Sequence, residues 1–297
     1  CWAVRLCIFF FGEKKVGICR RLWYNKNKIY TKRKTVMTPE KKSCPENRQG
    51  RSSENNYIVG RNAVLEALRA GRELDFVMVQ KGELHGSISR ILALCRERDI
   101  VLKEAQAGKL SELSGGLAHQ GVVAQPAATT YVELADLFEI SRERGQAPFF
   151  LIADRIEDPH NLGALIRTAE ACGVHGIIIQ KRRGVGANAT VYKTSAGALS
   201  HLAVARVPNL TDAVMTLQKN GVWVYAADAA GECYSRMKFD GPIALVVGSE
   251  GHGVSQRLLQ QCDFKVSLFM RGQVNSLNAS VAGGILMYEI ARQRFGY

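Results

Sequence analysis

From Phe149 onward, short apolar runs alternate with amphipathic segments, and this pattern limits the fold more than any other feature of the chain. The apolar runs lie at 150–153, 176–179, 203–207, 222–226, 243–247 and 264–268. Nearly continuous apolar strands are typical of a parallel sheet whose two faces are both covered by helices. Helices are expected at 162–172 and 278–294. The sequence therefore predicts an α/β fold with a mostly parallel sheet flanked by helices.

A smaller α/β unit precedes this region. Helical segments are expected at 63–68, 88–98 and 109–113, and strand-like segments at 76–79, 100–102 and 121–124. Pro126 ends the unit, and a polar, partly helical connector leads from Thr129 to Pro148. We therefore expect a basic tail over 1–56, a small domain over 57–125, a linker over 126–147 and a second domain over 148–297.

Basic residues are concentrated at the start of the chain. The formal net charge is +13, and residues 1–56 carry 14 Lys and Arg against 4 Asp and Glu. Met37 opens a polar stretch typical of a protein start, so we expect residues 1–36 not to be native and the tail to be disordered. Gross charge is then weak evidence for a nucleic-acid partner, and function has to be argued from motifs.

Cysteine spacing and hydropathy exclude several classes of protein. The eight cysteines include no Cys-x-x-Cys pair, so neither a zinc site nor a disulfide framework is predicted, and we expect no metal. Cys95 and Cys172 occupy apolar helix positions and are expected to be buried. No apolar run approaches the roughly 18 residues of a membrane span. We expect a cytoplasmic protein with no membrane contact.

The first motif, residues 158–173, follows an apolar strand. Either Asp158 or Asn161 can cap the helix, whose apolar stripe ends at Gly173. Arg167 lies off that stripe, where solvent or a partner surface is its natural neighbour. An exposed helical arginine is in most proteins only part of a solvated face, so Arg167 gains weight only from the other motifs.

The second motif joins a strand to a glycine-rich turn over 244–254. Three glycines within 248–253 allow a ligand to approach the backbone at the carboxyl end of a strand, where open α/β sheets bind ligands. The spacing matches neither a P-loop nor a dinucleotide fingerprint. Glu250 among the glycines is harder to explain as a turn residue, whereas His252 is interpreted as an ordinary loop histidine.

The third motif spans 266–282 and comprises a strand, a glycine loop and a helix entry. Either Ser276 or Asn278 would serve as the N-cap of that helix. Capping explains one of these polar residues more readily than the whole loop. The three motifs together resemble, in the same order, those of the SpoU (TrmH) family of RNA ribose 2′-O-methyltransferases, within the SPOUT superfamily.

The resemblance covers residues 57–297 and implies a fold, a cofactor and a substrate. The small domain resembles the L30e-like substrate-binding domain of the subgroup that methylates a guanosine in large-subunit (23S) rRNA. The second domain would form a deep trefoil knot that binds S-adenosylmethionine. Family members are homodimers that complete the RNA site across the interface, so a homodimer and an RNA partner, either rRNA or a ribosome assembly intermediate, are implied.

The resemblance also implies roles for individual residues. Gly248, Leu268 and Leu277 would line the adenosine site. Catalysis would involve Asn161, Arg167, Glu250, Ser276 and Asn278. A guanidinium stays protonated in proteins, so we expect Arg167 to position phosphate and stabilise developing oxyanion charge rather than act as a base. Glu250 would orient the ribose hydroxyl or accept its proton.

Four other functions are weighed on the sequence alone. A tRNA ribose methyltransferase and an antibiotic-resistance rRNA methyltransferase would carry similar motifs. A non-catalytic RNA-binding protein of the same fold is disfavoured because the five polar motif residues are intact. A nucleotide-binding dehydrogenase is a poor alternative, since its fingerprint is absent.

Overall fold

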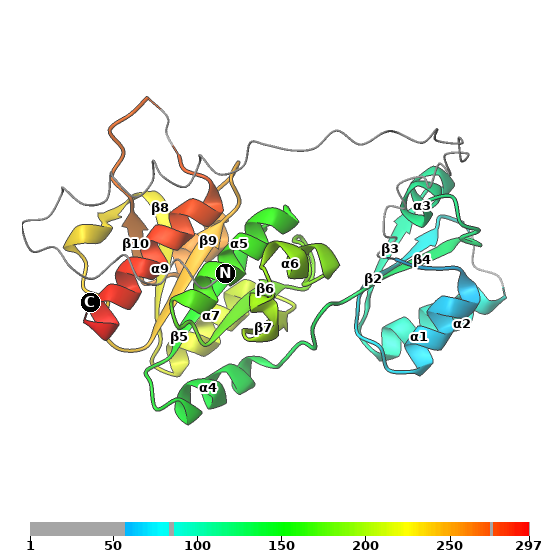
Figure 1. The fold of residues 1–297 in the computed structure, drawn as a ribbon, viewed down its shortest axis with the longest axis horizontal. Helices are drawn as coiled ribbons and strands as arrows, with labels where there is room; N and C mark the ends of the chain where they lie inside the picture. The colour runs from blue at the N-terminus through cyan, green and yellow to red at the C-terminus, as the bar shows by residue number, and fades with distance from the viewer. Residues whose placement is uncertain (1–56, 83–85, 274–275, 297) are drawn as a thin grey trace, which may run out of the picture. The chain divides into compact units, whose positions relative to one another are not determined.

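The computed structural model describes residues 57–82, 86–273 and 276–296 (Figure 1). The expectations for the basic tail, and for residues 1–36 within it, lie outside these residues. In the described part of the chain no helix is long and apolar enough to cross a membrane.

The first described region is a small mixed sheet with three helices. Its strand order is β1-β4-β2-β3, in which β2 and β3 are parallel and β4 is antiparallel to both β1 and β2. The strands are β1 (Ile58–Val59), β2 (Leu74–Gln80), β3 (Val101–Ala105) and β4 (Val122–Pro126). The helices are α1 (Arg61–Arg69), α2 (Ser87–Glu97) and α3 (Ala107–Ser114). Buried side chains of α1, α2, β2 and β4 share one core.

The second region is a six-stranded sheet with the order β10-β8-β9-β5-β6-β7, and every neighbouring pair is parallel. The strands are β5 (Phe149–Asp154), β6 (Gly176–Gln180), β7 (Ala203–Val207), β8 (Trp223–Cys233), β9 (Ile243–Gly248) and β10 (Phe264–Ser267). The helices are α4 (Leu134–Glu143), α5 (Pro159–Ala171), α6 (Ala189–Thr194), α7 (Leu210–Lys219), α8 (Gln256–Gln261) and α9 (Ala279–Phe295). The α/β architecture with a parallel sheet is confirmed, whereas the trefoil knot stays a prediction.

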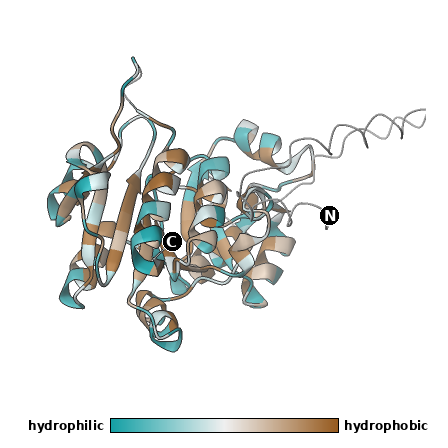
Figure 2. Ribbon diagram, turned by 60° about the vertical axis from the view of Figure 1, so that its left-hand side comes forward, coloured by the Kyte–Doolittle hydropathy of each residue, from teal (hydrophilic) through white to brown (hydrophobic). Residues whose placement is uncertain are grey.

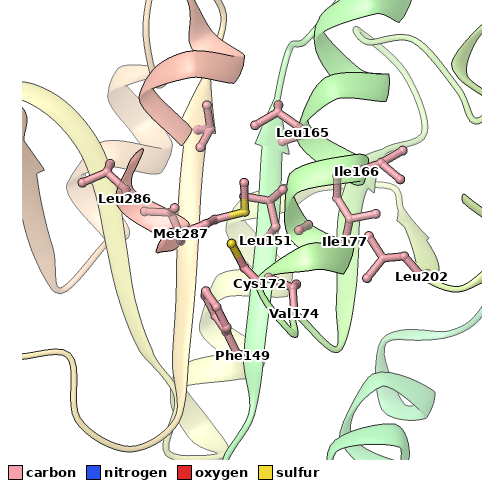
Figure 3. Close-up of a cluster of buried hydrophobic side chains, with 14 of the residues drawn as sticks. Phe149, Leu151, Leu165, Ile166, Cys172, Val174, Ile177, Leu202, Leu286 and Met287 are labelled. Atoms are coloured by element: carbon pink, nitrogen blue, oxygen red, sulfur yellow. The ribbon is translucent and has the colours of Figure 1, made fainter. Parts of the chain in front are cut away.

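Both faces of the large sheet are buried, which explains why its strands are continuously apolar. All six residues of β5 and of β9 are buried. One face packs against α5 and α9, where Leu151 meets Leu165 and Met287 (Figure 3). The other face packs against α4, α7 and α8. Each fully buried Leu or Ile contributes roughly 1.5–3 kcal/mol by leaving water. Figure 2 shows the central strands as mainly hydrophobic and the helices as two-sided.

Three features of this region differ from the sequence expectation. Short helices α6 and α8 and the ten-residue α7 were not predicted. Strand β8 continues to Cys233, well past the expected end at 226, and pairs with β10 across an irregularity between Lys265 and Val266. Helix α5 begins at Pro159 because Asp158 is its N-cap, accepting a hydrogen bond from the His160 backbone at 2.9 Å. Asn161 lies within the helix instead.

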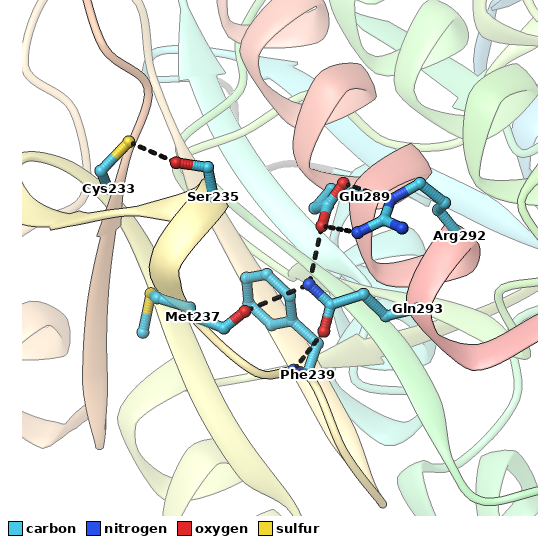
Figure 4. A network of polar contacts seen from close by, with 7 residues as sticks. All are labelled: Cys233, Ser235, Met237, Phe239, Glu289, Arg292 and Gln293. Atoms are coloured by element: carbon cyan, nitrogen blue, oxygen red, sulfur yellow. Dashed lines mark hydrogen bonds and ion pairs between the residues drawn. The ribbon is translucent and has the colours of Figure 1, made fainter. Parts of the chain in front are cut away.

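The carboxyl-terminal half of α9 is held by hydrogen bonds to the segment between β8 and β9 (Figure 4). The Gln293 amide donates to the Met237 carbonyl at 3.1 Å and accepts from the Phe239 backbone at 2.9 Å. Glu289 accepts from Gln293 and from Arg292, and both partners lower the pKa of its carboxyl. These contacts fix the position of the helix whose other end carries the third motif.

His175, just before β6, makes the stability of the fold sensitive to acid. Its ring is 2% exposed, and Nδ1 accepts from the Phe149 backbone at 3.0 Å while Nε2 meets the Gln146 oxygen at 3.1 Å. Burial, reinforced by Arg144 and Arg294, lowers the pKa of His175 to about 4. The unfolded chain takes up this proton near pH ~6.5, so the free energy of unfolding should fall as pH drops from there towards 4.

We expect this loss to reach about 2–3 kcal/mol, measured by chemical denaturation at successive pH values. A His175→Asn variant keeps an acceptor for the Phe149 backbone but does not titrate. Its stability should therefore depend less on pH over this window. An equal slope in the variant would assign the acid sensitivity to other groups.

Candidate active site

The candidate site lies where three strands of the large sheet end at the same edge. Because the sheet is parallel, the loops that follow β5, β9 and β10 meet at the carboxyl ends of the strands. These loops lead into α5, α8 and α9 and carry the first, second and third motifs respectively. Segments more than one hundred residues apart in the sequence therefore form one site.

Three of the predicted residues form a single hydrogen-bonded cluster. The Asn161 amide donates to Oε1 of Glu250 at 2.7 Å, and the Asn278 amide donates to the oxygen of Asn161 at 3.0 Å. Asn278 also donates to the same Oε1 of Glu250. Within the described residues, Oε2 of Glu250 has no hydrogen-bond partner. The cluster therefore orients the carboxylate and leaves one of its oxygens available to a ligand.

Asn278 also caps α9 and is thereby held in place. Its side-chain oxygen accepts from the backbone of Ser280 at 2.9 Å and of Val281 at 3.3 Å. The Ser280 hydroxyl lies 2.6 Å from that oxygen and 3.4 Å from the oxygen of Asn161. Ser280 therefore belongs to the cluster. It was not predicted as a site residue because a serine in the first turn of a helix is common. Of the two expected N-caps, Asn278 is the one used.

The glycine turn after β9 is tight for a steric reason. Gly253 donates its backbone N–H to the Ser249 carbonyl at 2.8 Å and closes the turn. A Cβ at Gly248 would lie less than 3.0 Å from backbone atoms of Gly253 and Val254. The buried Asp154 at the end of β5 accepts from the Ser255 backbone at 2.7 Å and ties the turn to the neighbouring strand. Sequence analysis did not single out Asp154.

A cavity of about 470 Å³ opens beside this turn. Gly248, Leu268 and Leu277, the residues expected to line an adenosine site, all line it, as does Ser276. Most of its other side chains are apolar, and they come from Ala227–Ala230, Val266 and the start of α9. Size and lining are those of a small-molecule site with few polar groups.

A second cavity of about 490 Å³ also adjoins Glu250. Its lining includes Arg155, Asp158, Asn161 and His252. Glu250 lines both cavities, as do Ser249 and Gly251. The carboxylate is therefore placed between two sites that could hold two different reactants.

Two expected site residues stand outside the cluster. Arg167 is exposed on α5, lines neither cavity, and makes no hydrogen bond or ion pair within the described part of the chain. Ser276 lines the first cavity, and it has no hydrogen-bond partner among the described residues. The three motifs predicted that Arg167 and Ser276 act together with Asn161 and Glu250. In the described residues, neither Arg167 nor Ser276 is hydrogen-bonded to Asn161 or Glu250.

Cys95 and Cys172 take no part in the site. Cys95 and Cys172 are buried as expected, and burial raises the pKa of each thiol to about 11. Neither lines the two cavities beside Glu250. Across residues 57–82, 86–273 and 276–296, no group of three His, Cys, Asp or Glu side chains is placed to hold a metal ion.

Two protein-family profiles match the chain. The SpoU rRNA Methylase family profile matches residues 148–288, and the profile for RNA 2'-O ribose methyltransferase substrate binding matches residues 57–132. The chain is 45% identical over 244 residues to the putative TrmH family tRNA/rRNA methyltransferase YacO of Bacillus subtilis, covering 82% of this chain and 98% of that protein. A putative TrmH family relative from Staphylococcus saprophyticus is 40% identical, with coverage of 81% and 97%.

Two solved structures with bound AdoMet have a similar fold. The SpoU methyltransferase AviRb from Streptomyces viridochromogenes is 26% identical with a TM-score of 0.51, and the match covers 80% of this chain and 90% of that one. The rRNA methyltransferase from Sinorhizobium meliloti is 25% identical with a TM-score of 0.50, covering 80% and 86%.

Proposed function

Because this chain belongs to the SpoU (TrmH) family of RNA 2′-O-ribose methyltransferases, we propose that it methylates a guanosine of large-subunit rRNA. The chemistry of the family is S-adenosylmethionine-dependent transfer of a methyl group to a ribose 2′-oxygen in RNA. The choice of guanosine and of 23S rRNA is the proposal. One observation carries the assignment of the site: Glu250 lines both a cavity with the size and lining of a small-molecule site and a second, adjoining cavity.

The first cavity fits S-adenosylmethionine. Leu268 and Leu277 offer apolar surface for an adenine ring, and Gly248 leaves the backbone turn accessible. Asp228 lines the same cavity and offers a carboxylate oxygen for hydroxyl or amino groups. When bound there, the cofactor supplies an electrophilic methyl group on a sulfonium. The chain's own residues have to orient the ribose and remove its proton.

Glu250 is the group best placed to handle that proton. Asn161 and Asn278 both donate to Oε1, so they hold the carboxylate in one orientation. Oε2 then remains to accept the proton of a 2′-hydroxyl in the second cavity. Asn161 and Asn278 act as positioning residues in this scheme. Ser276 lies in the cavity wall, where it can contact the ribose or the cofactor.

Arg167 requires a second subunit to take part. An apolar groove next to it runs between α5 and α9 and is lined by Thr168, Ile285 and Tyr288. Ile285 is 39% exposed and Tyr288 54%, which is unusual for such large apolar side chains. We propose that a second copy of the chain covers this face in a homodimer and that each Arg167 serves the partner's RNA site. There its guanidinium would stabilise negative charge on phosphate or on the developing oxyanion.

The domain roles follow from the same proposal. Residues 57–125 form an L30e-like domain that binds RNA, residues 126–147 link it, and residues 148–297 carry out methyl transfer. The match of residues 57–132 to a substrate-binding family supports the first assignment. A substrate in the ribosome places the reaction in the cytoplasm.

The substrate is tested by nucleoside mass spectrometry. Ribosomal RNA and tRNA that lack ribose methyl groups are incubated separately with labelled S-adenosylmethionine and the protein. We expect label in 2′-O-methylguanosine of the large-subunit RNA, and a loss of at least about 100-fold in Arg167→Ala. Arg257→Ala, which removes an exposed arginine on α8, is the control and should retain activity. Label confined to tRNA would contradict the proposed substrate.

A further inference from the structure

Two arginines in neighbouring loops of the large domain have backbone conformations that favour glycine. Arg155, directly after β5, has φ of 56°, and Arg183, in the loop after β6, has φ of 65°. Only three other non-glycine residues of the described chain have positive φ, and none of them is basic: Asp99, Gln120 and Ala196. The left-handed region costs an L-residue free energy that glycine does not lose. Such strain is concentrated at functional sites, which makes both arginines candidates for a function.

Both loops lie at the edge of the sheet that carries the site. Strands β5 and β6 are parallel neighbours, so their carboxyl ends are adjacent. The Val185 backbone donates to the Ile156 carbonyl at 2.9 Å and joins the two loops directly. Arg155 itself lines the second cavity together with Asn161 and Glu250. Arg155 therefore borders the cavity proposed for the acceptor ribose, and Arg183 belongs to the loop that is hydrogen-bonded to the Arg155 loop.

The guanidinium N–H donors of Arg155 and Arg183 make no hydrogen bonds within the described residues. Among the described residues Arg155 pairs only with Asp154, whose Oδ1 lies 4.0 Å from Nε, too far for a hydrogen bond. The other carboxylate oxygen of Asp154 accepts a hydrogen bond from the Ser255 backbone N–H. Arg183 is exposed and has no hydrogen bond or ion pair among the residues described. Both side chains keep their donors for a ligand.

The two loops together carry three arginines, at positions 155, 182 and 183. Arg182 and Arg183 are both exposed, whereas Arg155 is half-buried in the wall of the second cavity. Besides Glu250, the second cavity is lined by the carboxylates of Glu157 and Asp158. Asp158 is the N-cap of α5, and Glu157 is exposed. A guanidinium binds phosphate oxygens through parallel N–H donors, and a phosphate is what an RNA strand presents on either side of a ribose.

We propose that Arg155 and Arg183 form a phosphate-binding strip that holds the RNA backbone flanking the acceptor nucleotide. This inference rests on the proposed function and names residues of the catalytic domain, outside the substrate-binding domain, that contact the RNA. Phosphate contacts carry no base specificity, so the strip sets position and affinity, while other groups select the nucleotide.

The test uses glycine because it separates the backbone effect from the charge effect. Arg155→Gly and Arg183→Gly relieve the strained conformation, so the thermal midpoint should equal or exceed that of the wild type. Affinity for an unmethylated large-subunit rRNA transcript should fall about 3–10-fold for each variant at moderate salt. The slope of log affinity against log salt should become shallower by about 0.7–0.9 per arginine removed, as expected for one lost phosphate contact.

Two control variants match the two changes. Ala196→Gly makes the same backbone change at an exposed residue with φ of 52° and should leave RNA affinity unchanged. Arg144→Gln removes an exposed positive charge at the end of α4. Arg144 precedes the amino end of β5, whereas Arg155 follows its carboxyl end, so this variant should keep the wild-type salt slope. In activity assays, KM for RNA should rise in Arg155→Gly while affinity for S-adenosylmethionine stays the same.

Each outcome decides the proposal. Wild-type RNA affinity and salt slope in both glycine variants, with the wild type still methylating the transcript, would overturn the strip but leave the proposed function standing. A thermal midpoint several degrees below that of the wild type would show that the arginines serve the fold instead. If the wild-type protein neither binds nor methylates any of the RNAs tested, the proposed function and the strip both fail.

Discussion

Glu250→Gln is expected to lower kcat by about 10²–10⁴-fold, the usual contribution of a positioned general base. The substitution keeps an oxygen that can accept from Asn161 and Asn278, so the hydrogen-bonded cluster can persist. It replaces the second oxygen, the proposed proton acceptor, with an amide nitrogen that donates. Single-turnover rates with saturating RNA and cofactor measure the effect directly.

The affinity for S-adenosylmethionine and the thermal midpoint separate this role from a structural one. Both should change little in Glu250→Gln, because the side chain keeps its shape and its contacts. Glu143→Gln, an exposed residue near the end of α4, removes the same charge away from the site and should retain full activity. Near-normal turnover in Glu250→Gln would remove the proposed role and move the search for the proton acceptor to another group.

Gly248→Ala is expected to weaken binding of S-adenosylmethionine by about 100-fold. The added methyl group would lie less than 3.0 Å from backbone atoms of Gly253 and Val254, which cannot rotate away as a flexible side chain would. Relieving such a clash typically costs about 1–3 kcal/mol. The turn that lines the cavity would have to move, and a penalty near 3 kcal/mol corresponds to about 100-fold in affinity. Isothermal titration with the cofactor measures it.

Gly251→Ala is the matched control for Gly248→Ala. It lies in the same turn, and nothing is within 4 Å of the position that its Cβ would occupy. We expect the cofactor affinity of Gly251→Ala to stay within about threefold of the wild type, as is usual for surface changes of this size. Equal losses in the two variants would show that the turn depends on glycine in general and not on close backbone packing at Gly248.

The architecture of the large domain could be predicted because its strands are buried on both sides. Continuous apolar runs such as those of β5 and β9 leave few alternatives to a helix-covered parallel sheet. The short helices were missed for a physical reason. Helix α6 has six residues and is held by its Asn188 cap, which accepts from two backbone N–H groups, so periodicity had too few turns to detect it.

The site was predictable only in part, because hydrogen bonds across distant segments leave no local signal. Asn161 and Glu250 are 89 residues apart, and their contact follows from strand order rather than spacing. Ser280 and Asp154 look like ordinary helix and strand-end residues until the fold joins them to the cluster and the turn. Arg155 was missed because backbone conformation, not residue type, distinguishes it. The exposure of Arg167, by contrast, followed from its position off the apolar stripe of its helix.

Transfer of the methyl group to ribose and not to a base is tested by alkaline hydrolysis of the labelled RNA. Alkali cleaves RNA through the 2′-hydroxyl, so a 2′-O-methyl group blocks cleavage at its own nucleotide. RNA labelled by the wild-type protein should release its label in alkali-stable dinucleotides, and Glu250→Gln should release almost none. Label recovered in mononucleotides would instead show that the methyl group is on a base, and 2′-O-methylation by this protein would be ruled out.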